Sequence, residues 1–436
     1  MRPASLNSSR VTELFAAGLF LVYAVILFAH RTPPSFTDFS NWTYQGVLLH
    51  NHLLGVPDPA HLLKQYPVPN SANTVGMALL ALCLPWVVAV KTWLCLQFLV
   101  AFFCLRSLVR AVGAHPAVWI IVPGAVFLNV NLWYGFLNFQ LGLCWVLLLA
   151  ALLLRRAQGV ARGDLPVAGL LLLAFFTHMV PFAFCCLLLL LYVWQTERWR
   201  TLWVAVPAFA MTIWYVLGRY LVARNADGDT GMQDAAPYLS RLFWAFKVNS
   251  CLKSFGLVNP LSADSIWLGK AGFAVLLCAN VLLIGILLLL AVRAARRSFA
   301  QCTADRFLWL AILSMVPFYL LLPSVILGIS DPGARIFQIF SALGIVLACM
   351  AGRALAAWAA GASMVLSVAA VLLFVRFGFQ PVWNADEHAL HAIDRLAHVP
   401  NNDQDYFYDA LNQRDFSLKV FPTGLFLNTA SASIHR

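Results

Sequence analysis

Residues 11–42 read VTELFAAGLFLVYAVILFAHRTPPSFTDFSNW, an apolar run followed by a polar loop that contains Asp38. The apolar run, residues 11–29, matches a membrane-spanning helix, which needs about 20 residues. Only 18 of the 436 residues are Asp or Glu, so a carboxylate at the rim of a membrane helix is rare in this chain. Asp38 is therefore the strongest single indication of chemistry in the sequence.

The composition is that of an integral membrane protein. Hydrophobic residues make up 61% of the chain and charged residues 11%, against about 45–50% and about 25% in soluble domains. The apolar runs are continuous rather than alternating, which excludes a membrane β-barrel and predicts an all-α polytopic protein. Most Lys and Arg residues behind the net charge of +11 lie beside apolar runs, as the positive-inside rule requires. We therefore expect membrane lipid as a partner and no nucleic acid.

Basic residues also predict the orientation of the first helices. Two arginines flank the first apolar run, so the N-terminus is expected in the cytoplasm and the loop of residues 30–73 outside. Two apolar stretches follow, 74–90 and 92–111, separated by little more than Lys91. If both crossed the membrane, the basic cluster at residues 155–162 would lie outside. The first stretch is therefore predicted to be a partial helix.

The later apolar stretches predict a bundle of about nine full spans with partial helices. The stretch 163–197 has basic flanks and is broken at 177–181, so we expect two half-helices that enter from the cytoplasm and return. A second outside loop covers residues 223–265. Residues 1–377 thus form the membrane domain, and 378–436 form a short outside tail. The full spans are expected at 11–29, 92–111, 117–134, 136–154, 202–222, 267–292, 306–326, 335–352 and 358–377.

Cysteine and histidine patterns predict neither metal nor cofactor. Most of the ten cysteines lie within apolar runs, where thiols behave as small hydrophobes. Cys251 lies in the second outside loop without an obvious partner, so no disulfide is expected. His50 and His52 are two residues apart and would not share a helical face, which argues against a zinc site.

Asp38 has two interpretations. Thr37 or Asp38 fits the N-cap of a helix whose apolar face carries Phe39 and Trp42, because carboxylates stabilise the free N–H groups there. Asp38 also fits a general base at a cavity on the membrane surface. The local sequence is compatible with both.

Three short motifs extend the pattern around this loop. They read YPVPN at residues 66–70, GFLNFQLG at 135–142 and THMVP at 177–181. With the single first helix, the acidic outside loop and the partial helix, they resemble the GT-C class of integral membrane glycosyltransferases, in its bacterial form. The resemblance covers about residues 11–350.

The resemblance implies a reaction and a place for it. GT-C enzymes take a sugar from a polyprenyl-phosphate carrier and transfer it at the outer face, here the periplasmic or extracellular face of a bacterial plasma membrane. A carboxylate in the first outside loop deprotonates the acceptor hydroxyl, and transfer inverts the anomeric carbon. Asp38 matches that position. The acceptor is a glycan, a lipid or a protein. Because no second carboxylate accompanies Asp38, the resemblance implies a reaction without a metal ion.

Further residues are candidates for substrate contacts. Donor phosphate is expected to bind Arg335, which opens a helix at the outer boundary where the positive-inside rule disfavours arginine. Pairing with Asp331 or snorkelling towards the interface would also explain this arginine. Other candidates for the donor phosphate are Lys64, His61 and His52. Candidates to line the substrate site are Asn131, Asn138 and Gln140.

His178 interrupts the pair of half-helices, and an ionisable residue at membrane depth is a functional candidate. A neutral histidine bonded to a free carbonyl near Pro181 would explain it equally well.

The whole sequence is also compatible with a transporter or flippase, a polysaccharide polymerase or ligase, and a non-catalytic relative. Transporters usually place ionisable residues near the membrane midplane. The polar groups of this chain are expected at one face, which favours a surface reaction.

Overall fold

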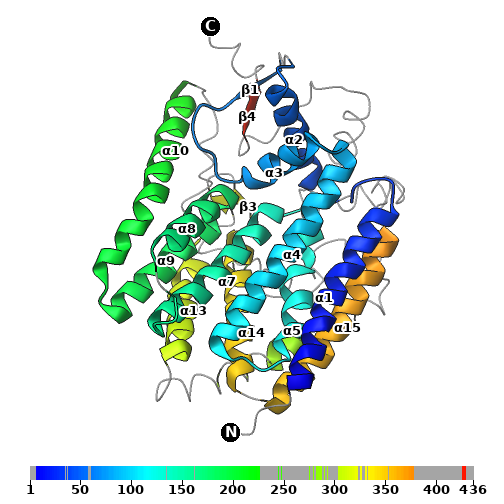
Figure 1. Ribbon diagram of the computed structural model, residues 1–436, viewed down its shortest axis with the longest axis vertical. Helices are drawn as coiled ribbons and strands as arrows, with labels where there is room; N and C mark the ends of the chain where they lie inside the picture. The colour runs from blue at the N-terminus through cyan, green and yellow to red at the C-terminus, as the bar shows by residue number, and fades with distance from the viewer. Residues whose placement is uncertain are drawn as a thin grey trace.

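The computed structural model describes residues 6–225 with short gaps, scattered helical positions between 244 and 292, residues 303–377 with short gaps, and residues 425–428. The described helices form an elongated bundle, with the start of α1 (Leu6–Ala29) at one end and the strand β4 (Phe426–Asn428) at the other (Figure 1). The prediction of an all-α fold is confirmed, because the only described strands form two short ribbons.

The further helices occupy most of the described chain. They are α2 (Phe39–Leu53), α3 (Ala72–Ala81), α4 (Trp86–Val112), α5 (Val118–Val122), the π-helical turn η1 (Pro123–Phe127), α6 (Val130–Trp133), α7 (Leu137–Ala157), α8 (Leu165–Thr177), α9 (Met179–Thr196), the 3-10 turn η2 (Trp199–Ala205), α10 (Val206–Asn225), α13 (Thr303–Leu321), α14 (Pro332–Ala351) and α15 (Arg353–Phe377).

Among the described residues, five helical segments are long and apolar enough to cross a membrane, so the predicted number of about nine is not established. Two of the predicted spans do not correspond to a single helix in the structure. The stretch 117–134 is divided between α5, η1 and α6, and the stretch 267–292 lies largely outside the described residues. The five segments are Arg10–Ala29, Trp86–Val112, Leu137–Ala157, Met179–Thr196 and Trp199–Leu221.

The partial helix α3 has 10 residues and is too short to cross a bilayer, in line with the prediction. The break between it and α4 lies at residues 82–85, not at Lys91 as predicted. Pro85 precedes α4, where its missing N–H costs no helical hydrogen bond. Lys91 lies inside α4, and its ammonium group donates to the carbonyl of His30 just after α1.

The helices α8 and α9 form a hairpin that begins and ends at one side of the bundle. At the end of α7, Arg156 donates to Asp164 over 2.7 Å and lies 5.9 Å from the ring centre of Tyr192 in α9. The tip of the hairpin is His178, whose ring centre lies 5.6 Å from that of Phe139 at the start of α7. The segment therefore returns as predicted, but it reaches farther than two half-helices, along most of α7.

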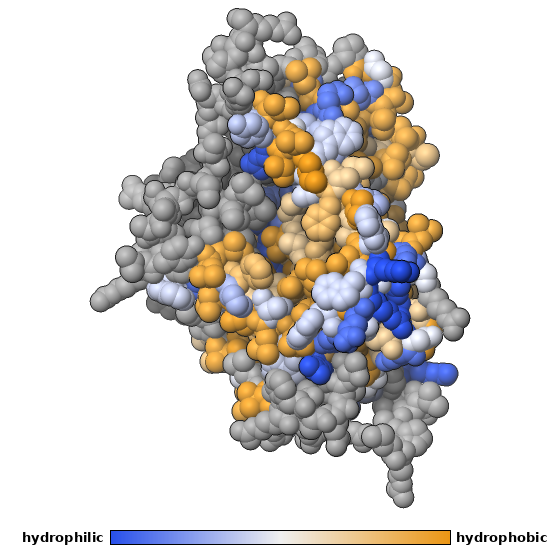
Figure 2. All heavy atoms as spheres, turned by 90° about the vertical axis from the view of Figure 1, so that its left-hand side faces the viewer, coloured by the Kyte–Doolittle hydropathy of each residue, from blue (hydrophilic) through white to orange (hydrophobic). Residues whose placement is uncertain are grey.

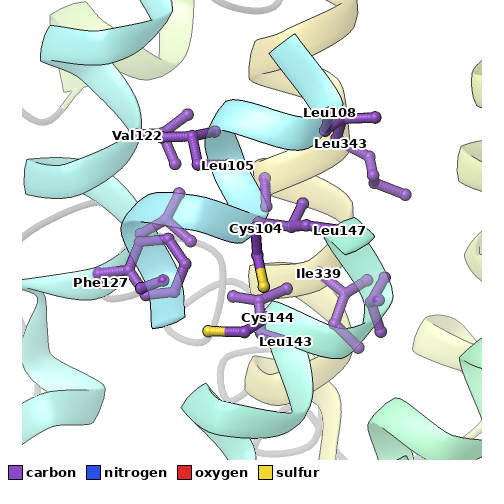
Figure 3. Packing of buried hydrophobic residues seen from close by; sticks show 14 of the residues in the cluster. Cys104, Leu105, Leu108, Val122, Phe127, Leu143, Cys144, Leu147, Ile339 and Leu343 are labelled. Carbon is purple, nitrogen blue, oxygen red and sulfur yellow. The ribbon is translucent and has the colours of Figure 1, made fainter. Parts of the chain in front are cut away.

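The core lies around α7, which is buried along most of its length. Lipid tails are as apolar as leucine, so close packing rather than the hydrophobic effect holds membrane helices together. The described cysteines are free thiols, and Cys251 lies outside the described residues. Figure 3 shows Cys104, Leu105 and Leu108 of α4, Val122 of α5, Phe127 of η1, Leu143, Cys144 and Leu147 of α7, and Ile339 and Leu343 of α14 in this core.

A two-stranded ribbon joins the segment that follows α2 to the last described residues. The strand β1 (His61–Leu63) pairs antiparallel with β4, so His61 lies opposite Asn428. The N–H of Leu425 donates to the side-chain carbonyl of Gln45 in α2 over 3.1 Å, which extends the attachment. The second ribbon pairs β2 (Val325–Ile326) with β3 (Ile329–Ser330) just before α14.

Cysteine labelling tests the orientation of this bundle. In a chain without the exposed Cys83 and Cys278 and without Cys251 and Cys302, we expect Leu62→Cys and Arg31→Cys to react with an impermeant thiol reagent from one side of sealed vesicles. All three positions are exposed. Arg200→Cys is expected to react from the other side, because Arg200 lies at the end of the bundle opposite to Arg31 and Leu62. Reaction of Leu62→Cys and Arg200→Cys from the same side would contradict the topology.

Candidate functional site

Asp38 occupies the N-cap position of α2 but does not cap the helix through its side chain. Its backbone is in the right-handed helical region, with φ −81° and ψ −10°, and its carboxylate makes no capping hydrogen bond. The side chain is half-buried. The N-cap interpretation therefore holds for the position of Asp38 and not for the carboxylate, which is not engaged in capping. Thr37, the alternative cap, lies outside the described residues.

The turn before α7 packs directly on the backbone of Asp38. Gly135 in this turn has φ +72°, a conformation that glycine adopts at little cost. A Cβ atom at this position would lie 2.6 Å from the amide nitrogen of Phe39 and 2.8 Å from that of Asp38. The two segments, far apart in sequence, can approach this closely only because residue 135 has no side chain.

Arg335, in the first turn of α14, is the third part of the site. It is 6% exposed, and its guanidinium carbon lies 4.2 Å from the centre of the Phe136 ring, a cation–π contact. Its charge also acts on the carboxylate of Asp38. The predicted base and the first predicted phosphate ligand therefore lie within electrostatic range of each other. Asp331, the suggested ion-pair partner of Arg335, lies outside the described residues.

The surroundings make Asp38 a stronger base than an ordinary aspartate. Burial raises the pKa of Asp38 from its usual 3.8 to about 6, and the positive charge of Arg335 opposes part of this rise. Burial disfavours the charged carboxylate, while a nearby cation favours it. At neutral pH the group is thus mostly ionised, yet its affinity for a proton suits general base catalysis.

His178, at the tip of the hairpin, lies in the same electrostatic environment, because the charge of Arg335 acts on its ring. Its Nδ1 accepts a hydrogen bond from the N–H of Val180 over 3.1 Å and so caps α9. The sequence suggested that His178 donates to a carbonyl near Pro181, whereas Nδ1 accepts from the N–H of Val180 instead. Since Nδ1 is the acceptor, the neutral ring carries its proton on Nε2.

The polar residues predicted to line the substrate site hold the local backbone together. The side chain of Asn138 donates to the carbonyl of Asn70 over 2.8 Å and accepts from the N–H of Asn73 over 3.0 Å. This amide therefore fixes the start of α3 against α7. A role for Asn138 in contacting substrate remains a prediction.

Asn131 and Gln140 are similarly engaged, in the helices that follow η1. The side-chain nitrogen of Asn131 lies 2.5 Å from the side-chain oxygen of Gln338, and Gln140 donates to the carbonyl of Phe127 over 2.9 Å. Gln338 in turn donates to the carbonyl of Val126. A π-helical turn leaves backbone carbonyls without their usual helical partners, and these amides supply donors to them.

The remaining predicted phosphate ligands lie in other surroundings. His61 is buried in the ribbon, with its ring centre 6.2 Å from Tyr44 and 6.3 Å from Phe426. His52 is exposed near the end of α2. Lys64 is buried beside α10, where the charge of Arg219 acts on it. The structure thus brings Arg335 to Asp38 and places Lys64 in a second group of cations.

Three residues of this region were missed by reasoning from the sequence. Gly135 and Phe136 were noted only as part of the motif GFLNFQLG. No pattern in the sequence indicated that Gly135 contacts Asp38 or that Phe136 contacts Arg335. Arg219 carried a usable signal, because it lies in the distal half of a span predicted to run outward, where arginine is disfavoured.

Among the described residues, no three His, Cys, Asp or Glu side chains are grouped closely enough to hold a metal ion. Comparisons of the chain with protein families, with curated proteins and with solved structures gave no match.

Proposed function

We propose that this protein is a glycosyltransferase that moves a sugar from a polyprenyl-phosphate carrier to an acceptor hydroxyl at the outer face of a bacterial plasma membrane. The observation that carries the proposal is the electrostatic effect of the buried Arg335 on Asp38, a half-buried carboxylate with a raised pKa. One group accepts a proton and the other attracts a phosphate. Helices long and apolar enough to span a membrane support a donor held in the bilayer.

The proposed reaction is a single displacement. Asp38 takes the proton of the acceptor hydroxyl while the hydroxyl oxygen bonds to the anomeric carbon. The bond from that carbon to the phosphate oxygen breaks on the opposite face, so the configuration inverts. The polyprenyl phosphate leaves with the bonding electrons, and the positive charge of Arg335 stabilises it. Asp38 ends the reaction protonated and returns the proton to water. The proposal includes no metal ion.

A transporter or flippase of a lipid-linked solute is the second candidate. The broken helix pair α8–α9, with the ionisable His178 at the break, is the observation that favours it, because transporters use such breaks to bind solutes. The location of His178 opposes it, since the ring contacts the first turn of α7 and not its middle.

The two candidates differ in what happens to a labelled donor. Sealed vesicles are supplied on the outer side with polyprenyl phosphate that carries a radiolabelled sugar, together with the cell-envelope acceptor fraction. The proposed enzyme forms a labelled acceptor product on the outer side of the vesicles, and the donor does not have to cross the membrane. Movement of intact donor across the membrane without a new product would support the transporter and refute the transferase.

Replacing Arg335 by glutamine is expected to lower the rate of transfer about 10²-fold, because one donor to the developing phosphate charge is lost. Arg335→Lys should recover part of the rate, and Arg31→Gln, an exposed cation just after α1, should leave it unchanged. The charge of Arg335 lowers the pKa of Asp38, so its loss should also move the acidic limb of the rate profile to higher pH. A normal rate with an unmoved limb would remove Arg335 from the site.

A further inference from the structure

A groove of about 360 Å³ lies on the side of the bundle, along a strip of α7 that the neighbouring helices leave uncovered. Helix α7 packs against both α4 and α8 and lies between them (Figure 1). Its residues in the groove are Leu148, Leu152 and Arg155, whose spacing places them on one face of the helix. All three are half-buried, whereas most of α7 is fully buried. The groove is therefore a gap between α4 and α8, with α7 as its floor.

Gly169 of α8 keeps this gap open. It lines the groove, and a Cβ atom at this position would have no other atom within 4 Å. A side chain there would thus extend into empty space. An apolar cavity of about 150 Å³ takes up a benzene ring, so a groove of about 360 Å³ has room for a segment of hydrocarbon chain.

The groove opens towards lipid. Leu173, one of the residues that line it, is exposed. Figure 2, which faces the left-hand side of the bundle as drawn in Figure 1, shows a mostly hydrophobic surface on which the hydrophilic side chains are gathered in patches. In a bilayer such a surface meets acyl chains rather than water, because polar groups facing lipid are costly.

One end of the groove attracts an anion. The guanidinium of Arg155 donates to the carbonyl of Ser107 in α4 over 3.4 Å, and no carboxylate in the described part of the chain pairs with it. The N-terminus of α8 lies at the same end, because Pro166 in its first turn also lines the groove. Asp164, just before this helix, does not cap it and pairs with Arg156 over 2.7 Å. An arginine and the positive end of a helix dipole together favour a negatively charged group.

We propose that the groove binds one acyl chain of an anionic glycerophospholipid, with the headgroup phosphate at Arg155 and the chain along Leu152 and Leu148. These leucines extend about 10 Å from the charge, which is two helical turns. The positive-inside rule places the basic end of α7 in the cytoplasm, and basic pockets between membrane helices on that side suit anionic headgroups.

This lipid is a component of the bilayer and not the sugar donor. Asp38 packs on the turn before α7, whereas Arg155 lies in the last turn of that helix. The site is therefore separate from the proposed transfer and does not depend on it. A bound chain would fill the gap between α4 and α8 and so stabilise the bundle in membranes that contain anionic lipid.

The Kd of the first bound dioleoylphosphatidylglycerol, measured by native mass spectrometry of the purified full chain in detergent, tests the site. Gly169→Leu fills the groove and Arg155→Gln removes its charge, so each is expected to raise this Kd about tenfold. Gly361→Leu is the matched control for the first, because Gly361 of α15 is also exposed and also has no atom within 4 Å of a Cβ. Arg200→Gln, at an exposed arginine outside the groove, is the control for the second. Both controls should keep the wild-type Kd.

Two comparison ligands separate the parts of the site. Dioleoylphosphatidylcholine has the same chains with a zwitterionic headgroup and should bind about fivefold more weakly. Inorganic phosphate should not displace phosphatidylglycerol, because it lacks the acyl chain. Equal binding of the two phospholipids, or displacement by inorganic phosphate, would overturn the proposal.

The groove itself is tested by Gly169→Leu. A Kd for phosphatidylglycerol within twofold of wild type in this variant would also overturn the proposal. The added side chain meets no atom, and leucine favours a helix more than glycine does, so the variant should unfold at or above the wild-type temperature in lipid-free detergent. That measurement excludes misfolding as the cause of a loss of binding. Phosphatidylglycerol carries no transferable sugar, so failure of the transfer reaction would not affect the result.

Discussion

Transfer of labelled sugar is expected to fall about 10²–10⁴-fold when Asp38 is replaced by asparagine, because a positioned general base contributes about that much to the rate. Asparagine has nearly the same shape and cannot accept the proton. The backbone position of residue 38 is set by the contact with Gly135, so the fold should survive the substitution. Rates of product formation in membranes with equal amounts of each variant give the measurement.

The pH dependence of the wild type should identify the same group. With the pKa of Asp38 at about 6, the rate is expected to rise as the pH passes through about 6 and then to level off. An acid whose pKa is raised on folding binds its proton more tightly in the folded state. This group therefore stabilises the fold at low pH, and that stability is lost as the pH rises from 3.8 through about 6. Loss of activity below pH 6 thus reflects protonation of the base and not unfolding caused by Asp38.

The matched control is Asp164→Asn, which makes the same chemical change in an exposed carboxylate that pairs with Arg156. It should leave both the rate and the pH profile unchanged. A rate for Asp38→Asn within about threefold of wild type would exclude Asp38 as the base, since so small a change is far below the effect of losing a general base.

Gly135→Ala is expected to damage the site without touching a charged group. The new methyl group would meet backbone nitrogens at 2.6 and 2.8 Å, and φ is +72° at this position. The left-handed conformation costs a non-glycine residue about 1–2 kcal/mol, and overpacking about 1–3 kcal/mol more. Relief of the contact must move the backbone of Asp38. A displacement of about 1 Å at a catalytic group can cost about 10²-fold in rate, which transfer assays and thermal unfolding would measure.

Gly113→Ala separates the two causes. Gly113 ends α4 with φ +65°, and a Cβ atom there would have no atom within 4 Å. The control therefore carries the backbone strain without the crowding, and it should lose about 1–2 kcal/mol of stability and retain its rate of transfer. Equal rates in the two variants would show that the contact between Gly135 and Asp38 does not position the carboxylate.

The composition was sufficient to predict the all-α membrane class. Two charged residues in unusual positions, Asp38 and Arg335, predicted the centre of the candidate site. Asp38 and Arg335 stand out because carboxylates are scarce in this chain and arginine is disfavoured at the outer boundary, where the sequence predicts Arg335 to lie. Each could be picked out alone, without knowledge of the other. The structure adds that the charge of one acts on the other.

Helix packing could not be predicted in the same way. A membrane helix is apolar on every face, so the pattern along it does not indicate which side meets a neighbour. The contact of Gly135 with Asp38 and that of Tyr66 with Gly218 depend on such packing. The sequence also did not indicate that the amide of Asn138 is bonded to the backbone of Asn70 and Asn73, because those contacts depend on how α3 packs against α7.

The β1–β4 ribbon has a consequence for how the protein is made. Because β1 and β4 lie far apart in the sequence, the loop that carries His61 and Lys64 can reach its final register only after Phe426–Asn428 has left the ribosome. The strand β4 therefore fixes the first loop late in synthesis, after the helices that lie between the two strands in the sequence. A chain that stops before Phe426 lacks the strand that pairs with this loop.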